Sequence, residues 1–284
     1  MKFRRSRERR DGIRPNKLLG QHFLVSGPIL KKIIAAAELS PNDTVLEVGP
    51  GLGTLTVELA QRAQRVIAVE KDSRLIPALE KNLRDQHIAN VEIVAGDILK
   101  LFPGELALPD EYRVIANIPY YLTSRLIRIL LEGEHPPRDI LLMVQQEVAK
   151  RIVAEPPHMN LLGLAVQTYA TPKTLFAVPP RAFSPPPQVS SALVSIKNIG
   201  RSFFVEQSVD EKKFFLVARA GFQGRRKILE NTLSRNLNIA KPKVREILGA
   251  HHLFGKRPET LSREEWARLT HAFANFSSLS RQSK

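Results

Sequence analysis

The sequence has no cysteine and no long apolar run. Because none of its 284 residues is Cys, disulfides, thiolate nucleophiles and cysteine-bound zinc are excluded together. No apolar stretch approaches the roughly 20 residues that a membrane-spanning helix needs. The basic first 17 residues are not followed by the apolar segment of a secretory signal. These absences predict a cytoplasmic protein that has no membrane partner and is not secreted.

Acidic residues are outnumbered by basic ones, and the excess is unevenly distributed. The net charge is +15, and residues 18–198 hold eighteen Lys or Arg and eighteen Asp or Glu. Residues 1–17 hold eight basic and two acidic residues, and residues 199–284 hold seventeen and eight. A generic basic surface is one explanation, but charge that served only solubility would not need this segregation. The pattern therefore favours a polyanionic partner, and we expect nucleic acid.

Apolar runs alternate with segments of helical period through the first two thirds of the chain. Short runs rich in Val, Ile and Leu predict strands within 44–51, 65–72, 90–97 and 112–121, and residues 139–152 begin as a strand and continue as a helix. Helical patterns fall between or after the strands at 27–39, 54–63, 73–86 and 122–133, and a late strand is expected at 189–196. This alternation is typical of βαβ units, and it predicts an α/β fold with a doubly wound, Rossmann-like sheet.

The pattern changes at about residue 199. Four segments of helical period follow, separated by polar breaks, at 210–222, 225–237, 241–254 and 262–276. We therefore expect three parts: a basic N-terminal arm (1–17), a ligand-binding α/β domain (18–198) and a small all-helical, RNA-binding domain (199–284).

Three glycines follow the first strand of the predicted sheet. The segment "LEVGPGLGTL" places Glu47 before Gly49, Gly51 and Gly53, where glycine lets the backbone turn tightly and approach a ligand. The dinucleotide fingerprint requires Gly or Ala at its sixth position, but Thr54 stands there. The pattern suits a ligand that carries no pyrophosphate, and a plain tight turn is the alternative.

A carboxylate stands at the end of each of the next two strands. Glu70 lies where an acidic residue can accept hydrogen bonds from ribose hydroxyls, and Asp97 lies where one can accept them from an adenine amino group. Each residue precedes a helical stretch, so a helix N-cap is the alternative for either. Together with the glycines, these strand ends predict a pocket for an adenosine without phosphate.

The fourth strand ends in "ANIPYY", residues 116–121. The Asn117 side-chain oxygen and the Ile118 carbonyl could accept hydrogen bonds from the exocyclic amine of a base, which would make its nitrogen more nucleophilic. Pro119 would hold that carbonyl in place, and Tyr120 offers a flat face for an extruded base. An X-Pro turn with two core aromatic residues is the alternative.

The ordered set of motifs resembles the small-subunit ribosomal RNA adenine dimethyltransferases of the KsgA (RsmA) type, which are class I S-adenosyl-L-methionine-dependent methyltransferases. The matching segments are "LGQHFL" at 19–24, "LEVGPGLGTLT" at 46–56, "VIAVEKD", "GDIL", "NIPYYLTS" at 117–124, "FSPPPQVSSALV" at 183–194 and "GFQGRRKILENTL" at 221–233. Three positions depart from the common pattern: His22 stands where Asn is frequent, Gln188 where Lys is frequent and Ser190 where Asp is frequent.

The resemblance implies a role for each matching residue. The cofactor would be S-adenosyl-L-methionine, with His22, Leu24, Gly49 and Gly51 on its methionine side, Glu70 at the ribose, Asp97 at the adenine and Asn117 beside both cofactor and target. The catalytic segment would be Asn117, Ile118, Pro119 and Tyr120. Tyr120 and Phe183 would stack on the two faces of the target base, and Arg225, Arg226 and Lys227 would contact RNA. No metal is implied.

The resemblance also implies the reaction. Such enzymes dimethylate N6 of two adjacent adenosines in a hairpin near the 3′ end of small-subunit rRNA, and the expected partner is that rRNA in the assembling small subunit, bound by a monomer. Two alternatives stay open. One is the related large-subunit rRNA dimethyltransferase of the macrolide-resistance type, and the other is a non-catalytic nucleic-acid-binding or assembly factor on the same fold.

Overall fold

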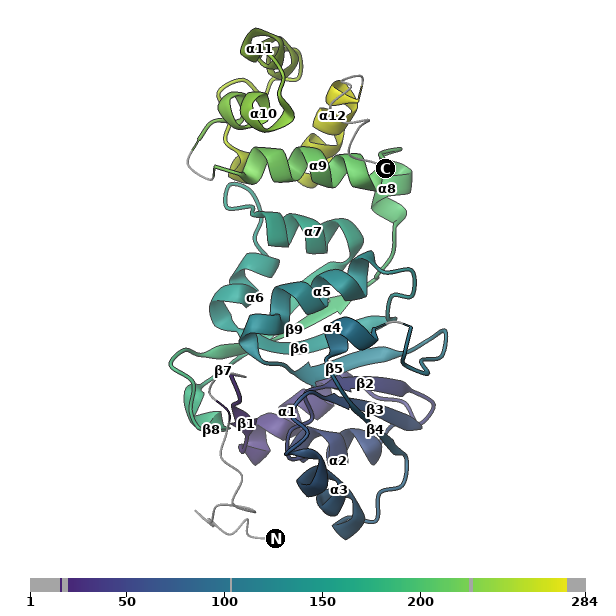
Figure 1. Cartoon of the computed structure of the whole chain (residues 1–284). Coiled ribbons are helices and arrows are strands. Elements are labelled where there is room, and N and C mark those ends of the chain that lie inside the picture. The colour runs from purple at the N-terminus through teal and green to yellow at the C-terminus, as the bar shows by residue number, and fades with distance from the viewer. Residues whose placement is uncertain (1–15, 17–19, 103, 225–226, 275–284) are drawn as a thin grey trace. The chain divides into compact units, whose positions relative to one another are not determined.

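The computed structural model describes residues 16, 20–102, 104–224 and 227–274 (Figure 1). The predicted basic arm lies outside this range except for Asn16. The described elements are β1 (Phe23–Leu24), α1 (Gly27–Ala37), β2 (Thr44–Val48), α2 (Thr54–Ala60), β3 (Arg65–Glu70), α3 (Ile76–Asp85), β4 (Val91–Ala95), α4 (Ile98–Leu101), β5 (Arg113–Asn117), η3 (Tyr120–Leu122), α5 (Thr123–Glu132), β6 (Asp139–Gln145), α6 (Gln146–Ile152), α7 (Leu161–Tyr169), β7 (Thr171–Val178), η4 (Pro180–Ala182), β8 (Phe183–Ser184), β9 (Ser191–Lys197), α8 (Ser202–Glu206), α9 (Glu211–Phe222), α10 (Leu229–Leu237), α11 (Lys241–Ala250), η5 (Pro258–Thr260) and α12 (Arg263–Phe273).

Within the described residues, seven strands form one sheet in the order β4-β3-β2-β5-β6-β9-β7. β2 pairs in parallel with both β3 and β5, β3 pairs with β4, and β5 pairs with β6. The strand order reverses between β2 and β5, because the chain builds outward through β3 and β4 and then returns to the other side of β2. This confirms the predicted doubly wound sheet. Ligands bind such sheets beyond the carboxyl ends of the strands at the reversal, here the ends of β2 and β5.

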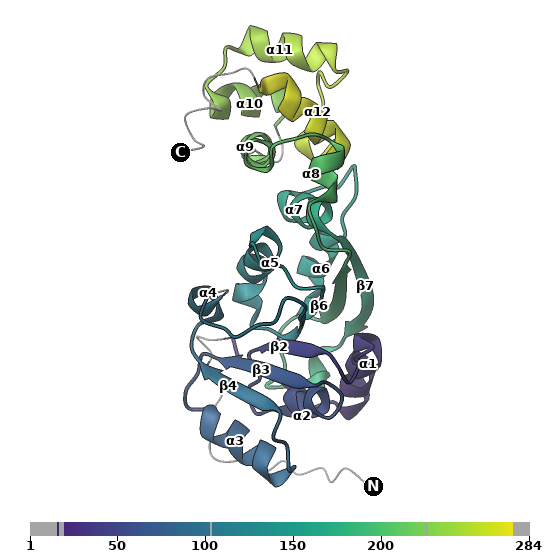
Figure 2. The ribbon, with the colours of Figure 1, turned by 90° about the vertical axis from the view of Figure 1, so that its right-hand side faces the viewer.

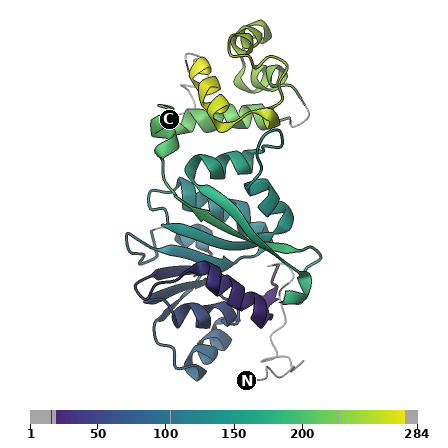
Figure 3. The same ribbon diagram turned by 180° about the vertical axis from the view of Figure 1, so that it is seen from behind.

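Helices cover both faces of the parallel strands. α2 and α3 lie on the opposite side of β2, β3 and β4 from α4 and α5 (Figure 2), and α1 lies across the same face as α2 (Figure 3). Ile33 of α1 and Leu59 of α2 belong to one buried cluster with Val45, Val66 and Ile115 of the strands. Strands buried on both faces read as continuous apolar runs, and this is why the sequence pattern located them.

Several elements escaped the sequence pattern. β7 is the edge strand of the sheet, and most of its side chains are exposed or half-buried. It contains Pro172, which an edge strand tolerates because one row of its N–H groups needs no partner. β1 and β8 have two residues each and pair antiparallel, with Leu24 opposite Phe183. Segments this short carry no periodicity, but their pairing brings the "GQHFL" and "FSPPP" motifs together.

A buried ion network anchors the amino end of β5. Arg113 is 5% exposed, and it donates to Asp139 on β6 and to Asp43 before β2, each at 2.9 Å. The two carboxylates satisfy the guanidinium away from water, as a buried charge requires. The network ties β2, β5 and β6 together at the end of the sheet opposite Asn117.

The described contacts divide the chain into two compact units. One comprises residues 1–146 and 175–195, and the other comprises residues 147–174 and 196–284, so α6 and α7 group with the C-terminal helices. The second unit has its own core, which includes Trp266 and Phe273, both fully buried. The predicted domain limits at 198 and 199 follow the sequence pattern and stay a prediction. None of the helices that the structure describes has the length and apolar character needed to cross a membrane.

Candidate functional site

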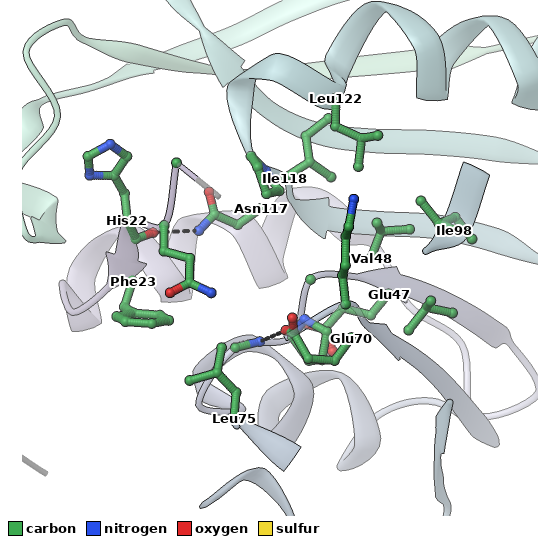
Figure 4. Close-up of a pocket in the computed structure, with 18 of the residues that line it drawn as sticks. His22, Phe23, Glu47, Val48, Glu70, Leu75, Ile98, Asn117, Ile118 and Leu122 are labelled. Carbon is green, nitrogen blue, oxygen red and sulfur yellow. Dashed lines mark hydrogen bonds between the residues drawn. The ribbon is translucent and has the colours of Figure 1, made fainter. Parts of the chain in front are cut away.

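A cavity opens beyond the carboxyl ends of β2, β3 and β5 (Figure 4). Residues from five separate segments of the chain line it, and among them are ten residues that the sequence singled out: His22, Leu24, Gly49, Gly51, Glu70, Asp97, Asn117, Ile118, Pro119 and Tyr120. The cavity lies at the reversal of strand order, where the topology of the sheet places a ligand site.

The turn after β2 forms one wall of the cavity. Gly51 has φ +59°, and a β-carbon there would lie 3.1 Å from two atoms of the Phe23 ring. Gly53 has φ +84°, and a β-carbon there would lie 2.6 Å from Leu79. Both the backbone conformation and the close packing therefore require glycine, which leaves main-chain atoms free to approach a ligand.

Glu70 ends β3 and holds this turn in place. Its carboxylate accepts hydrogen bonds from the Gly51 N–H at 3.0 Å and from the Asp72 N–H at 2.8 Å. Burial raises the pKa of Glu70, although these two backbone donors favour its charged form. A carboxylate offers about four lone-pair sites, so acceptor capacity remains for a ligand hydroxyl. Glu70 does not cap the next helix, because α3 begins after Leu75.

Asp97 follows β4 and does cap a helix. Its Oδ1 accepts from the Leu99 N–H at 3.1 Å at the start of α4, and its Oδ2 accepts from Lys71 Nζ at 2.8 Å. The Lys71 hydrogen bond lowers the pKa of Asp97, which keeps this residue an acceptor. The N-cap role considered from the sequence is therefore present, and it coexists with a place in the cavity wall.

Asn117 ends β5 with its side chain in a defined orientation. Its Nδ2 lies 3.2 Å from the main-chain oxygen of His22 (Figure 4). A carbonyl oxygen can only accept a hydrogen bond, so the amide nitrogen must face His22, and Oδ1 is left as an acceptor in the cavity wall. The "GQHFL" motif thus fixes which atom of Asn117 the site presents.

Tyr120 is held from two sides. Its hydroxyl lies 2.8 Å from Ser191 Oγ at the start of β9, and its ring stacks loosely on His22, with centroids 5.8 Å apart and planes at 30°. The His22 Nδ1 lies 2.8 Å from the Pro185 carbonyl oxygen. The "GQHFL", "NIPYY" and "FSPPP" segments, which are far apart in the sequence, therefore meet around one aromatic ring.

Comparisons with known proteins agree with this geometry. A family model described as ribosomal RNA adenine dimethylase matches residues 12–269. The chain belongs to this family. Ribosomal RNA small subunit methyltransferase A of Dehalococcoides mccartyi strain CBDB1 is 47% identical over 264 residues, which cover 92% of this chain and 89% of that protein.

Two solved structures extend the likeness to the fold. A dimethyladenosine transferase from Plasmodium falciparum has a TM-score of 0.76 and 27% identity, over 89% of this chain and 98% of that one. The 23S rRNA methyltransferase ErmE has a TM-score of 0.67 and 25% identity, over 89% of this chain and 100% of that one. A Rossmann-like sheet followed by helices is therefore shared with a solved dimethyladenosine transferase and a solved 23S rRNA methyltransferase.

Phe183 is the predicted base-stacking residue that the structure does not place in the cavity wall. Its side chain is 3% exposed and belongs to the core cluster that contains Leu24 and Ile33. In this conformation the ring contacts the protein interior and presents no face to a base. Its stacking role was inferred from the resemblance to the dimethylase family, and it stays a prediction that requires the ring to leave the core.

The variant Phe183→Leu tests which role applies. Because leucine fills most of the buried volume, we expect the free energy of unfolding to fall by less than about 1.5 kcal/mol; if Phe183 serves only the core, methyl transfer by the folded variant will match the wild type. Urea unfolding and a methyl-transfer assay on the same preparation measure both quantities. A large loss of activity at nearly unchanged stability would instead support stacking on the target base.

Glu47, Gln21 and Tyr121 are among the cavity residues that were not predicted as members of the dimethylase site. Glu47 is 1% exposed, and Tyr121, which was assigned no role, is 53% exposed; both line the cavity. Gln21 lines it too and donates to Asp72 at 2.9 Å. The position of Glu47 directly before the glycine turn could have indicated that it belongs to the site. The place of Gln21 within the "GQHFL" motif could have indicated the same.

The predicted RNA-binding residues of the dimethylase chain are only partly described. Arg225 and Arg226 lie outside the described residues. Lys227 is exposed and lies in the turn between α9 and α10, where its N–H donates to the Gly224 carbonyl at 2.7 Å. Its RNA contact stays a prediction. Among the described residues, no group of three or more His, Asp or Glu side chains is placed to hold a metal ion.

Proposed function

We propose that this chain dimethylates N6 of two adjacent adenosines in a hairpin near the 3′ end of small-subunit rRNA, with S-adenosyl-L-methionine as the methyl donor. The observation that carries the proposal is the fixed orientation of Asn117, whose amide nitrogen is held by the His22 carbonyl at 3.2 Å. Membership of the adenine dimethylase family supports it, and so does 47% identity to a small-subunit rRNA methyltransferase.

The cavity fits the cofactor. The backbone of the Gly51 turn lines the cavity without a side chain, and the Glu70 carboxylate retains acceptor capacity for ribose hydroxyls. Asp97 would accept from the adenine amine beside its Lys71 bond, while His22 and Leu24 would line the methionine side. When bound, S-adenosyl-L-methionine supplies a methyl group made electrophilic by its attachment to a sulfonium.

The protein would act on the target amine by positioning it. Hydrogen bonds from N6–H groups to Asn117 Oδ1 and to the Ile118 carbonyl would draw the nitrogen lone pair out of conjugation with the ring. Pro119, with φ −57°, fixes the backbone at that carbonyl. Tyr120 would support the flipped base. Acceptors that are already in place when the base arrives need no reorganisation during the reaction.

The proposed setting is the assembling small ribosomal subunit in the cytoplasm, bound by a monomer. The exposed Lys227 and the basic C-terminal region suit contacts with RNA phosphates. The test of the proposal is transfer of labelled methyl from S-adenosyl-L-methionine to undermethylated small subunits, followed by nucleoside analysis. We expect N6,N6-dimethyladenosine, and an absence of labelled adenosine would contradict the proposal.

A large-subunit rRNA substrate is the nearest competing function, and the similarity to ErmE favours it. The higher identity to a protein named for the small subunit outweighs that similarity. A primer-extension map of methylated adenosines on both rRNAs separates the two. The non-catalytic alternative requires loss of the cofactor site, and calorimetry with S-adenosyl-L-methionine tests it directly.

A further inference from the structure

Glu47 presents a buried carboxyl group for which the mechanism above has no use. It lies one residue before the end of β2, it is 1% exposed, and it lines the cavity (Figure 4). Its Oε2 has no well-formed hydrogen bond among the described residues, although the hydroxyl of fully buried Thr56 lies close enough to favour the charged form. An unpartnered polar atom of this kind is uncommon in a folded protein, and it calls for an explanation.

No free positive charge offsets Glu47 in the part of the cavity that the structure describes. The other titratable side chains that line the cavity are His22, Glu70, Lys71, Asp97, Tyr120 and Tyr121. Lys71 forms an ion pair with Asp97 at 2.8 Å, and the nearby carboxylate of Glu70 repels a second negative charge. The buried Arg113 pairs with Asp43 and Asp139 instead.

The cost of burying an unpaired carboxylate favours the protonated form of Glu47. Burial raises the pKa of Glu47 to about 8, with the Thr56 hydroxyl opposing the shift and the Glu70 carboxylate adding to it. In the absence of a ligand, the carboxyl therefore carries a proton at neutral pH. A cation that entered the cavity would reverse this preference, because an opposite charge nearby favours the ionised acid.

We propose that Glu47 releases its proton to solvent when the cationic methyl donor binds, and that the resulting carboxylate selects the donor over its demethylated product. This inference rests on the proposed function. The donor carries a sulfonium, an ammonium and a carboxylate, whereas the product is a neutral thioether with the same ammonium and carboxylate. Both carry the same ribose and adenine, so Glu70 and Asp97 cannot discriminate between them.

The direction of the pH dependence follows from this linkage. Below about pH 8, donor binding must remove a proton from Glu47, so affinity for the donor rises with pH by up to about tenfold per unit and then levels off. The product has no sulfonium, and its ammonium is offset by its own carboxylate, so we expect it to leave Glu47 protonated and its affinity to gain nothing from this group. The ratio of donor affinity to product affinity should therefore rise between pH 6 and pH 8.

Calorimetry in buffers of different ionisation enthalpy counts the released proton. With the wild type at pH 7, we expect S-adenosyl-L-methionine to release close to one proton more than S-adenosylhomocysteine does. Glu47→Gln should abolish that difference and flatten the pH dependence of the affinity ratio. Glu80→Gln, which alters an exposed carboxyl on α3, is the matched control and should behave as the wild type.

A second measurement does not depend on binding. The folded, cofactor-free protein keeps the Glu47 proton to higher pH than the unfolded chain does, so this group makes the fold less stable as pH rises from about 4.5 to 8. Urea unfolding should therefore show that the free energy of unfolding of Glu47→Gln rises relative to that of the wild type across that range. The free energy of unfolding of Glu80→Gln should show no such rise.

The outcomes separate this inference from the proposed function. The role of Glu47 would be overturned if the wild type and Glu47→Gln released equal numbers of protons. It would also be overturned if Glu47→Gln left the pH dependence of the donor-to-product affinity ratio unchanged. Either result would count against Glu47 even if rRNA adenosine is dimethylated. If Glu47→Gln does not fold, a wild-type affinity ratio that stays constant from pH 6 to pH 8 overturns it equally. Failure to bind either ligand would instead count against the proposed function.

Discussion

Replacing Asn117 by Ala should lower the turnover number of methyl transfer by about 10²–10³-fold, the usual cost of losing one hydrogen-bonding group aimed at a reacting centre. Cofactor affinity should fall far less, because the cavity keeps its glycine turn, Glu70 and Asp97. The loss concerns the step in which N6 becomes nucleophilic, and it should therefore appear in single-turnover kinetics with saturating cofactor and RNA. Calorimetry on the same variant measures the affinity.

Asn117→Asp refines this prediction. An aspartate keeps an acceptor oxygen toward the target amine, but it cannot donate to the His22 carbonyl, which Asn117 Nδ2 contacts at 3.2 Å. We expect turnover between those of Asn117→Ala and the wild type. Asn42→Ala, an exposed amide in the loop before β2, serves as the control. An Asn117→Ala enzyme with full turnover would remove the basis of the proposed mechanism.

Much of the cavity could be predicted because parallel strands end at a common edge. Gly49, Glu70, Asp97 and Asn117 each follow an apolar run of about five residues, and runs of that kind can be located from the sequence. Once the runs are assigned to one sheet, their carboxyl ends must lie together. The residues that the sequence predicts to lie together are therefore those at the carboxyl ends of parallel strands.

Other features depend on pairings that no local pattern encodes. Phe183 meets Leu24 across a two-residue antiparallel ladder, and Arg113 meets Asp43 across the sheet, 70 positions apart in the sequence. The burial of Phe183 is a property of the folded core, and the motif that contains it gives no sign of it. The same holds for β7, whose exposed side chains lack the periodicity of a half-buried strand.

The role of Glu47 could not be predicted from the sequence for a different reason. The sequence placed an acid before the glycines, but its chemistry depends on what surrounds it. An exposed carboxylate in that position would be ordinary. A carboxyl that is 1% exposed, with an oxygen that has no well-formed hydrogen bond among the described residues, changes its protonation state with the charge of the ligand. That conclusion requires the three-dimensional structure, which shows that Glu47 is buried and that Lys71 forms an ion pair with Asp97.

Replacing Glu70 by Ala should weaken binding of S-adenosyl-L-methionine by about 10²-fold or more, because hydrogen bonds to a charged group contribute about 1.5–3 kcal/mol each. Two causes contribute. The ribose hydroxyls lose their proposed acceptor, and the Gly51 and Asp72 N–H groups lose the carboxylate that orients the turn. Calorimetry measures the affinity, and Glu80→Ala on α3 is the matched exposed control.

A cofactor analogue without the ribose 2′-hydroxyl separates the two causes. The wild type should bind the analogue more weakly than the cofactor, whereas Glu70→Ala should bind both with similar affinity, since it has no carboxylate to recognise the hydroxyl. If Glu70→Ala discriminates as strongly as the wild type, the ribose assignment is wrong. Glu70 would then act only through the glycine turn, and the affinity it confers would come from holding the Gly51 backbone against the cofactor.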